Sequence, residues 1–278
     1  MKLELILMSS FVSVNDVEIA YTLAGQGPCV VFLHGWMCNQ SFWREQSELL
    51  RRQGYQCLTL DFRGHGQSDV PLESYSVEQL VCDLREVLKS LGIEQMVLVG
   101  HSMGGMVAQQ FCLEHGEHVV GLVLVTTIAA DRDGRLISKR IERDSQHMPF
   151  LAAFDRHFDH WFSSSTPMTV RDWVKKEMCL TCESPSLALV RSYGCFDQTG
   201  RLQQIGIPTL VIGTESDDST PASQCRELAE LIPQAQFVFI EGCGHFPMVE
   251  NPQRLQQQLL TFLQEIMPSK KGCEDVQR

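Results

Sequence analysis

The sequence has no apolar run long enough to cross a membrane. A membrane-spanning helix needs about 18 or more consecutive apolar residues, and no apolar run among the 278 residues approaches that length. The first eight residues carry one early lysine, and Glu4 interrupts their short apolar run, so they do not fit a secretory signal peptide. We therefore expect a cytoplasmic protein with no membrane partner.

Basic side chains are also scarce. The chain contains 23 Lys and Arg against 34 Asp and Glu, which gives a formal net charge of −11. The densest basic spot, Lys270 and Lys271, lies in a polar tail that soon turns acidic at Glu274 and Asp275. An acidic surface repels nucleic acids and anionic membranes. We expect no nucleic-acid partner, and no feature of the sequence indicates an oligomeric state.

Cysteine is plentiful, with 11 residues, but the spacings typical of a metal site or a disulfide framework are missing. Four cysteines occupy apolar strand or helix positions and are expected to be reduced core residues: Cys29, Cys57, Cys82 and Cys112. Cys179 and Cys182 form a lone C-x-x-C without a second pair at zinc spacing. His157 and His160 lie three residues apart, and no third ligand accompanies them in the sequence. We expect neither a metal nor another cofactor.

Apolar runs alternate with helical patterns along most of the chain. Strands are expected at 11–14 and 17–22, joined as a hairpin, and at 30–33, 57–60, 96–99, 122–125, 208–213 and 236–240. Helices are expected at 41–52, from Ser76 to about Leu91, and from about Gly105 to His115. A chain of 278 residues commonly forms one large α/β domain with an insertion. The alternation predicts a largely parallel central sheet that is covered by helices on both faces.

The pentapeptide Gly100-His101-Ser102-Met103-Gly104 follows the expected strand 96–99 and precedes a helical pattern. In this position G-x-S-x-G is typical of a nucleophile elbow, a tight strand-to-helix turn that exposes a serine hydroxyl. A side chain larger than hydrogen at either glycine would crowd the turn. The alternative is a chance match in a glycine-rich turn, and only partner residues elsewhere in the chain distinguish the two.

A serine nucleophile needs a histidine to take its proton and a carboxylate to orient that histidine. Along the chain the expected order is serine, acid, histidine. The acidic turn 214–221 follows the expected strand 208–213 and offers Glu215, Asp217 and Asp218. His245 follows the expected strand 236–240, and its alternative role is to hydrogen-bond within its own glycine-rich turn. The candidate parts therefore occur in the required order.

These residues make the chain resemble the α/β-hydrolases with a serine nucleophile, from about residue 12 to about residue 263. That group contains enol-lactonases, carboxylesterases, carbon–carbon bond hydrolases and cofactor-free haloperoxidases. In the family the acid usually lies four residues before the proline of the acidic turn, which favours Asp217. His245 matches the family's G-H-x-x-x-x-E-x-P ending, with Glu250 and Pro252 in place. The resemblance implies an α/β-hydrolase fold and a triad of Ser102, His245 and Asp217.

The segment 30–36 resembles the part of the family that supplies the oxyanion hole. The resemblance implies that the backbone amides of Trp36 and Met103 hold the oxyanion, which leaves both side chains free to line the pocket. His34 is expected to brace its loop rather than to act in catalysis. The turn 61–68 is expected to be structural, although its arginine and histidine are also compatible with an anion clamp.

Between 127 and 202 the strand–helix alternation gives way to a helical, aromatic-rich segment. In the family this is the place of an inserted helical lid, so we expect a core of residues 1–126 and 203–278 with a lid at 127–202. An apolar lid excludes water and strengthens electrostatic interactions in the site. The expected pocket residues are Trp36, Phe154, Phe158, Trp161 and Phe246, although aromatic residues at helical spacing more often pack in a core.

The expected function is that of a serine hydrolase that cleaves a small carboxylic ester or lactone through an acyl-enzyme. Haloalkane dehalogenases and epoxide hydrolases of similar sequence place an aspartate at the nucleophile position, so Ser102 argues against both activities. A thioesterase, an acyltransferase, a carbon–carbon bond hydrolase and a cofactor-free oxygenase of the same fold stay open as alternatives. So does a small-molecule receptor that keeps the triad but turns over slowly.

Overall fold

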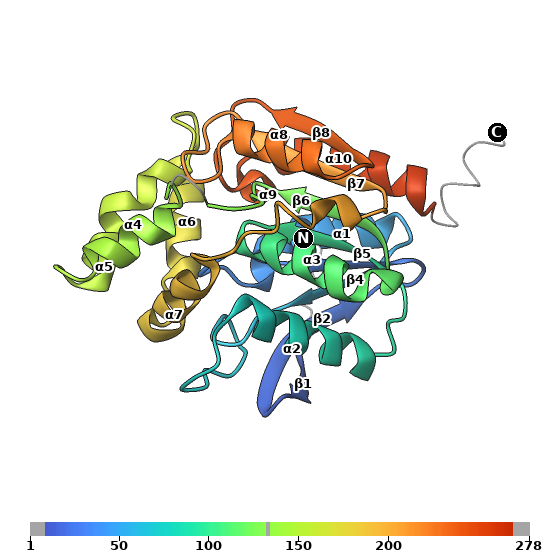
Figure 1. The fold of residues 1–278 in the computed structure, drawn as a ribbon, viewed down its shortest axis with the longest axis horizontal. Helices are drawn as coiled ribbons and strands as arrows, with labels where there is room; N and C mark the ends of the chain where they lie inside the picture. The colour runs from blue at the N-terminus through green and yellow to red at the C-terminus, as the bar shows by residue number, and fades with distance from the viewer. Residues whose placement is uncertain (1–8, 132–133, 269–278) are drawn as a thin grey trace, which may run out of the picture.

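A computed structural model describes residues 9–131 and 134–268 of the chain. Its centre is an eight-stranded sheet with the strand order β1-β2-β4-β3-β5-β6-β7-β8 (Figure 1). The strands are β1 (Ser10–Val14), β2 (Val17–Ala24), β3 (Cys29–Leu33), β4 (Gln56–Leu60), β5 (Met96–His101), β6 (Val119–Val125), β7 (Thr209–Thr214) and β8 (Ala235–Ile240). The pairs β1–β2 and β2–β4 are antiparallel, and the other neighbours are parallel. The predicted α/β fold with a mostly parallel sheet is confirmed.

The hairpin at the antiparallel edge forms where the sequence predicts it. Asn15 and Asp16 connect β1 to β2 with φ angles of 47° and 62°, in the left-handed region that these short polar residues tolerate better than most. This turn sets the register in which Val14 lies opposite Val17. The central strands β3 and β5 are buried along their whole length, as expected where helices cover both faces of a parallel sheet.

The helices of the core cover the two faces of the sheet. They are η1 (Gln40–Trp43), α1 (Arg44–Arg52), α2 (Val77–Ser90), α3 (Met103–His115), η2 (Gly116–His118), η4 (Leu202–Gln204), α8 (Ala222–Leu231), α9 (Pro247–Glu250) and α10 (Pro252–Ile266). α1 packs against α10, and α2 packs against α3. The hydroxyl of Ser76 caps α2 by accepting the N–H of Gln79 at 3.1 Å, at the predicted start of that helix. Within the described ranges, no helix combines the length and the apolar composition that crossing a bilayer requires.

The segment between β6 and β7 forms a helical insertion at one side of the sheet (Figure 1). It contains α4 (Ile137–Asp144), α5 (Phe150–His157), η3 (Phe158–Trp161), α6 (Met168–Met178) and α7 (Glu183–Tyr193). The chain enters and leaves this segment side by side, because Ala130 and Asp197 form an isolated antiparallel bridge. The boundaries 127 and 202 stay predictions, as does the role of the insertion as a lid.

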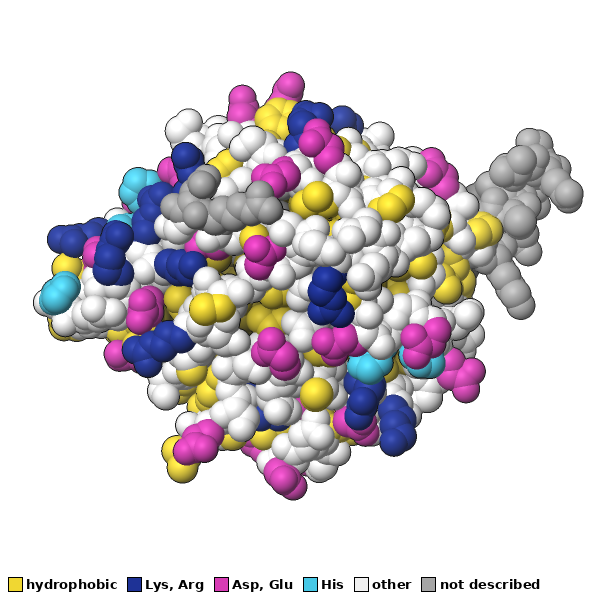
Figure 2. Space-filling model, in the orientation of Figure 1, with side chains coloured by type: hydrophobic (Ala, Val, Ile, Leu, Met, Phe, Trp, Pro, Cys, Tyr) yellow, Lys and Arg dark blue, Asp and Glu magenta, His cyan; other side chains and the backbone are white. Residues whose placement is uncertain are grey.

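Charge is distributed unevenly between the insertion and the core. Residues 127–202 contain eleven Lys and Arg against ten Asp and Glu, whereas the rest of the chain contains twelve against twenty-four. Figure 2 shows Lys and Arg side chains gathered over the insertion in this view. The net negative charge of the protein therefore belongs to the core, and the surface of the insertion repels an anionic small molecule less than the core does.

The ten cysteines in the described residues are free thiols. Cys29, Cys57 and Cys112 are buried, as predicted. The prediction for Cys82 is wrong, because this residue is exposed on α2. The buried face of that helix is formed by other residues: Val77, Leu80, Val81, Leu84, Val87 and Leu88. Cys82 directly follows Leu80 and Val81 in the sequence but points to solvent. The prediction was wrong because it rested on these apolar neighbours along the chain and not on the face of the helix.

Candidate active site

Ser102 lies in a strained turn between the last residue of β5 and the first residue of α3. Its backbone has φ 51° and ψ −119°, a conformation that residues other than glycine rarely adopt. A Cβ atom on Gly100 would lie 2.4 Å from the carbonyl oxygen of Gly104, and one on Gly104 would lie 2.4 Å from that of Leu33. Both glycines therefore make room for the elbow, as the pentapeptide indicates. The turn is fixed at Ser102, whose N–H donates to the Val125 carbonyl at 3.0 Å.

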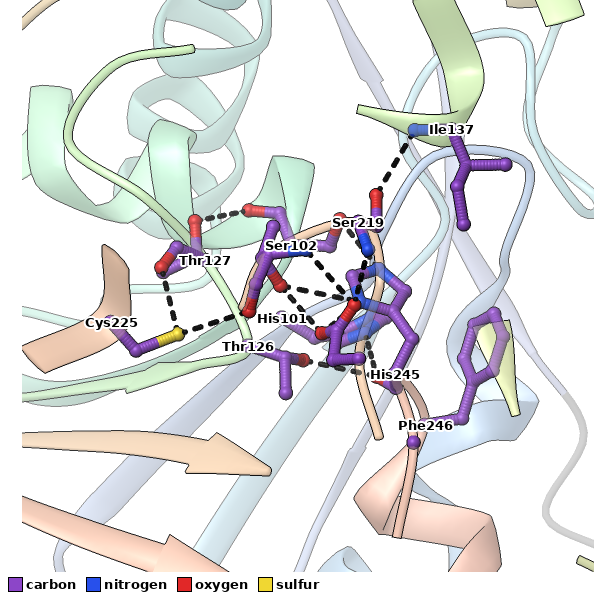
Figure 3. Close-up of polar contacts among 12 residues, drawn as sticks. His101, Ser102, Thr126, Thr127, Ile137, Ser219, Cys225, His245 and Phe246 are labelled. Carbon is purple, nitrogen blue, oxygen red and sulfur yellow. Dashed lines mark hydrogen bonds and ion pairs between the residues drawn. The ribbon is translucent and has the colours of Figure 1, made fainter. Parts of the chain in front are cut away.

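The elbow brings Ser102 next to His245 (Figure 3). The other nitrogen of the His245 ring contacts Asp217. The Ser102 Oγ lies 3.0 Å from His245 Nε2, and His245 Nδ1 lies 2.7 Å from Asp217 Oδ2. A carboxylate can only accept, so Nδ1 carries the proton of the neutral ring and Nε2 is left to accept the serine hydroxyl. Both side chains of the His245–Asp217 pair are buried. The arrangement is that of a general base aimed at a serine.

Asp217 is held by the turn that carries it. Its Oδ1 accepts the N–H groups of Ser219 and Thr220 at 2.8 and 2.9 Å, and its Oδ2 accepts the Thr220 hydroxyl at 2.6 Å. Burial disfavours the charged carboxylate, but the attraction of the His245 ring and the hydrogen bonds from His245 and Thr220 outweigh it. The pKa of Asp217 therefore lies below its ordinary value. The carboxylate is ionised at neutral pH and keeps the His245 ring oriented.

The two rival acids of the same turn are engaged elsewhere. Asp218 is exposed and pairs with the ring of His160 on the insertion, at 3.3 Å. Glu215 accepts the N–H of Gly242 at 2.7 Å and so caps the loop that leads to His245. Of the three carboxylates, Asp217 is therefore the one whose contact with the imidazole of His245 makes it a candidate acid.

The main chain of His245 is fixed as firmly as its ring. Its N–H donates to the Trp161 carbonyl at 2.6 Å. Its carbonyl oxygen accepts from His101 Nε2 at 2.9 Å and from the Thr126 hydroxyl at 3.0 Å (Figure 3). Sequence reasoning did not identify His101 or Thr126 as partners of His245. His101 occupies the variable position of the elbow, and the direction of its side chain is set by packing that no local pattern reveals.

The predicted oxyanion-hole amides belong to segments that meet at Ser102. Met103 is the first residue of α3, so its N–H has no acceptor within the helix. Gly35 approaches so closely that a Cβ there would lie 3.2 Å from the Ser102 Cβ, which brings the turn preceding Trp36 against the serine. The Trp36 indole donates to the Ser186 carbonyl at 2.9 Å and thereby joins this turn to α7. Binding of an oxyanion by the amides of Trp36 and Met103 stays a prediction.

His34 braces the loop after β3. Its Nε2 accepts the N–H of Phe62 at 3.0 Å, so its Nδ1 carries the proton that is donated to the Gly35 carbonyl at 2.8 Å. Burial lowers the pKa of His34 to about 4. The ring is therefore neutral and has both nitrogens engaged in backbone hydrogen bonds.

The turn 61–68 is likewise occupied by structural contacts. Arg63 forms a buried ion pair with Asp83 of α2. His65 donates to the Arg63 carbonyl and accepts the N–H of Met37 at 3.2 Å. Neither cation-forming side chain of this turn is available to clamp an anion.

A small cavity of about 20 Å³ lies beside Ser102 and His245. It has room for about one water molecule. Three of the predicted pocket residues, Trp36, Trp161 and Phe246, line it. Its remaining lining residues are His101, Met103, Met106, Leu136, Ser138, Met178, Tyr193 and Ser219. Four of these eight, Leu136, Ser138, Met178 and Tyr193, come from the ends of the insertion helices, whose placement depends on tertiary packing and was not predicted.

Phe154 and Phe158 do not line this cavity, contrary to the prediction. Both rings are buried within the insertion, and their centroids lie 5.4 Å apart. The Phe154 ring lies behind Trp161, with 6.0 Å between the centroids. The two phenylalanines form the aromatic core that supports Trp161, which is the packing role that helical spacing of aromatic residues more often indicates.

The histidine pair of the insertion also makes ordinary contacts. His157 Nε2 lies 2.9 Å from the Asp144 carboxylate, while His160 pairs with Asp218 as described above. Each imidazole is therefore engaged by a different acidic residue.

Comparison with known proteins shows the family to which this fold belongs. Residues 28–252 match the sequence model of the alpha/beta hydrolase fold family. A non-heme chloroperoxidase from Kitasatospora aureofaciens is 29% identical over 268 residues, which cover 90% of this chain and 97% of that protein. Est816, described as an N-acyl homoserine lactone degrading enzyme, is 26% identical with a TM-score of 0.82 and covers 91% of this chain and 100% of its own. An esterase from Exiguobacterium antarcticum, 24% identical, shares the fold with a TM-score of 0.85 over 92% of this chain and 100% of its own. The chain belongs to the alpha/beta hydrolase fold family.

Proposed function

We propose that this chain is a serine hydrolase that cleaves a small carboxylic ester or lactone. The observation that carries the proposal is the hydrogen-bonded series from Asp217 through His245 to Ser102, with distances of 2.7 and 3.0 Å. The similarity to an enzyme described as degrading an N-acyl homoserine lactone supports a lactone or ester as the substrate class.

In the acylation step, His245 Nε2 takes the proton of the Ser102 hydroxyl while Oγ attacks the substrate's carbonyl carbon. The carbonyl oxygen becomes an oxyanion, which the N–H groups of Trp36 and Met103 hold. Loss of one such donor costs about 2.7–4 kcal/mol of transition-state stabilisation in serine hydrolases. The tetrahedral intermediate then collapses, His245 gives its proton to the leaving oxygen, and the alcohol is released. For a lactone, the same alcohol stays attached to the acyl group.

Deacylation repeats these steps with water. His245 removes a proton from a water molecule whose oxygen attacks the acyl carbon, and the same two amides hold the new oxyanion. Ser102 then leaves and recovers its proton from His245. The products are a carboxylic acid and the free enzyme.

The size of the cavity supports a small acyl group. The cavity beside Ser102 has a volume of about 20 Å³. An acyl group larger than a water molecule fits there only if the side chains that line the cavity move. Met103, Met106 and Met178 belong to these walls. Methionine side chains are unbranched and adapt readily, so short acyl groups are expected to displace them at little cost.

Labelling by a fluorophosphonate probe together with turnover of p-nitrophenyl acetate tests the proposal. We expect the wild-type protein to react at Ser102 Oγ with release of fluoride and to release p-nitrophenol. Ser102→Ala should do neither, whereas Ser47→Ala, at an α1 position outside the cavity lining, should behave as wild type.

The outcome also separates the competing functions. An unreactive Ser102 together with tight small-ligand binding would favour a receptor over an enzyme. Faster turnover of thioesters than of matched oxygen esters would instead favour a thioesterase. Transfer to an added alcohol in preference to water would favour an acyltransferase, and cleavage of an activated carbon–carbon bond without ester turnover would favour a carbon–carbon bond hydrolase.

A further inference from the structure

Glu250, the last residue of α9, accepts four hydrogen bonds from two separate parts of the chain. Its Oε1 accepts the N–H of Phe246 at 3.0 Å. Its Oε2 accepts the N–H of Gly244 at 3.0 Å, the N–H of Ser163 at 3.3 Å and the hydroxyl of Thr166 at 2.5 Å. A carboxylate has acceptor sites for about four hydrogen bonds and no donor, so it suits a position that only donors surround.

The two donors from the core, Gly244 and Phe246, are the residues on either side of His245. Glu250 therefore fixes the peptide groups on both flanks of the general base. Backbone N–H groups donating to an ionised acceptor form hydrogen bonds about twice as strong as those between neutral groups. With these two peptides held, the main chain at His245 cannot rotate freely to move its ring away from Ser102.

The other two donors, Ser163 and Thr166, belong to the insertion between η3 and α6, and both are buried. This segment lies directly against the His245 loop, because a Cβ on Gly244 would come within 2.3 Å of the Trp161 carbonyl oxygen. The same carbonyl accepts the N–H of His245. Trp161 and Phe246 also form part of the cavity wall. One carboxylate thus joins the base, two walls of the cavity and the insertion.

We propose that Glu250 is a positioning residue, which holds His245 within reach of Ser102 and sets the insertion against it. This proposal rests on the proposed hydrolase function. Glu250 acts through hydrogen bonds to peptide groups and does not touch the reacting atoms. Its removal should slow the reaction of Ser102 more than it weakens substrate binding, because a small misplacement of a catalytic group can cost on the order of 10²-fold in rate.

Replacement by glutamine gives a graded test. A glutamine side chain has one oxygen and one NH₂ group, so in either orientation its NH₂ group faces at least one N–H donor. If the amide oxygen occupies the place of Oε2, three of the four hydrogen bonds survive and the clash is confined to Phe246. Glu250→Gln should therefore be impaired less than Glu250→Ala.

The experiment measures the rate of fluorophosphonate labelling and the separate kcat and KM for p-nitrophenyl acetate. Glu250→Ala should lose about 10²-fold in both the labelling rate and kcat, with KM changed by less than about threefold. Glu250→Gln should lose about 10-fold. Thr166→Val, which removes only one donor from the insertion, should leave kcat within about threefold. Glu241→Gln, a charge change at an exposed position of the same loop, serves as the matched control.

Circular dichroism and denaturant unfolding establish the folded fraction of each variant, and rates are normalised to it. If Glu250→Ala does not fold, the labelling rate and kcat of Glu250→Gln test the proposal instead. Wild-type labelling and kcat in a folded Glu250→Ala or Glu250→Gln protein would overturn the proposal, as would a loss confined to KM. A wild-type protein that neither labels nor turns over would contradict the proposed function itself, so the two failures are distinguishable.

Discussion

His101 Nε2 donates a hydrogen bond to the main-chain carbonyl oxygen of His245, across 2.9 Å. The carbonyl can only accept, so the proton of the His101 ring lies on Nε2, and among the described residues Nδ1 has no partner. Burial and the neighbouring His245 keep the pKa of His101 well below its ordinary value. The residue that precedes Ser102 in the chain therefore also anchors the main chain of His245.

Removing this anchor should weaken catalysis. His101→Ala deletes one of two donors to the His245 carbonyl, and we expect a loss of about 10-fold in kcat/KM, equivalent to about 1.4 kcal/mol. Thr126→Val deletes the other donor. Because both act on one oxygen, the double variant should depart from additivity. Steady-state kinetics with p-nitrophenyl acetate measure the effect, and unchanged kcat/KM in the double variant would rule out this role.

The triad itself should dominate the rate. Ser102→Ala, His245→Ala and Asp217→Asn should each lower kcat by roughly 10³-fold or more while leaving the fold intact, because the nucleophile, its base and the orienting acid act as a unit. Asp218→Asn is the matched control, since its side chain is exposed and contacts His160 rather than His245. Equal losses in Asp217→Asn and Asp218→Asn would mean that the acid is wrongly assigned.

Acyl-chain preference should respond to the wall formed by Met178. This residue lies at the buried end of α6 and lines the cavity, whereas Met168, at the other end of the same helix, is 66% exposed. Met178→Ala should raise the ratio of hexanoate to acetate turnover by about 10-fold or more, since space for each methylene is worth about 1–3 kcal/mol in an apolar pocket. Met168→Ala should leave the ratio unchanged. A ratio that moves equally in both variants would place the acyl group elsewhere.

Stability should fall in mild acid because of buried histidines. Burial, followed by the nearby His34, lowers the pKa of His65 to about 3, and burial lowers that of His34 to about 4. In the unfolded chain both imidazoles titrate near their ordinary value of 6.5. Above about pH 6.5 the folded and unfolded states bind equally few protons on these rings, so stability is independent of them. As pH falls below that value the unfolded state alone takes up protons, and the free energy of unfolding decreases by up to about 1.4 kcal/mol per pH unit for each ring.

Denaturant unfolding at several pH values between 7 and 4 measures this slope. His65→Gln should reduce the slope by about one proton, whatever its effect on stability at pH 7. His118→Gln provides the comparison, because that ring is half exposed at the end of η2. A slope in His65→Gln equal to that of the unaltered protein would show that His65 titrates normally in the fold.

Much of the fold and the order of the candidate site residues can be predicted from the sequence, because both depend on short-range patterns. The β1–β2 hairpin, the strands and the elbow around Ser102 each have a local chemical cause in turn residues, glycine spacing or apolar runs. The choice of Asp217 among the three acids of its turn rested on the resemblance to the family, in which the acid usually lies four residues before the proline. Its contact with His245 is then a consequence of β7 and β8 being parallel neighbours.

The cavity could not be predicted in the same way. Phe154 and Phe158 have the same aromatic character as Trp161, and only the crossing of insertion helices decides which ring faces Ser102. The polar cavity residues Ser138 and Tyr193 lie far apart in the sequence, on α4 and α7. Their convergence depends on tertiary packing, which also explains why exposure was misjudged at Cys82.

The Trp161 carbonyl, in the middle of the insertion, accepts the N–H of His245, while the Trp36 indole donates to Ser186 of α7 and the two ends of the insertion meet at the Ala130–Asp197 bridge. The insertion is therefore tied to the core at several separate points, one of which is the main chain of the candidate base. We expect any displacement of η3 from the core to break the hydrogen bond from the His245 N–H, so that motion of the insertion and the orientation of the His245 ring are coupled.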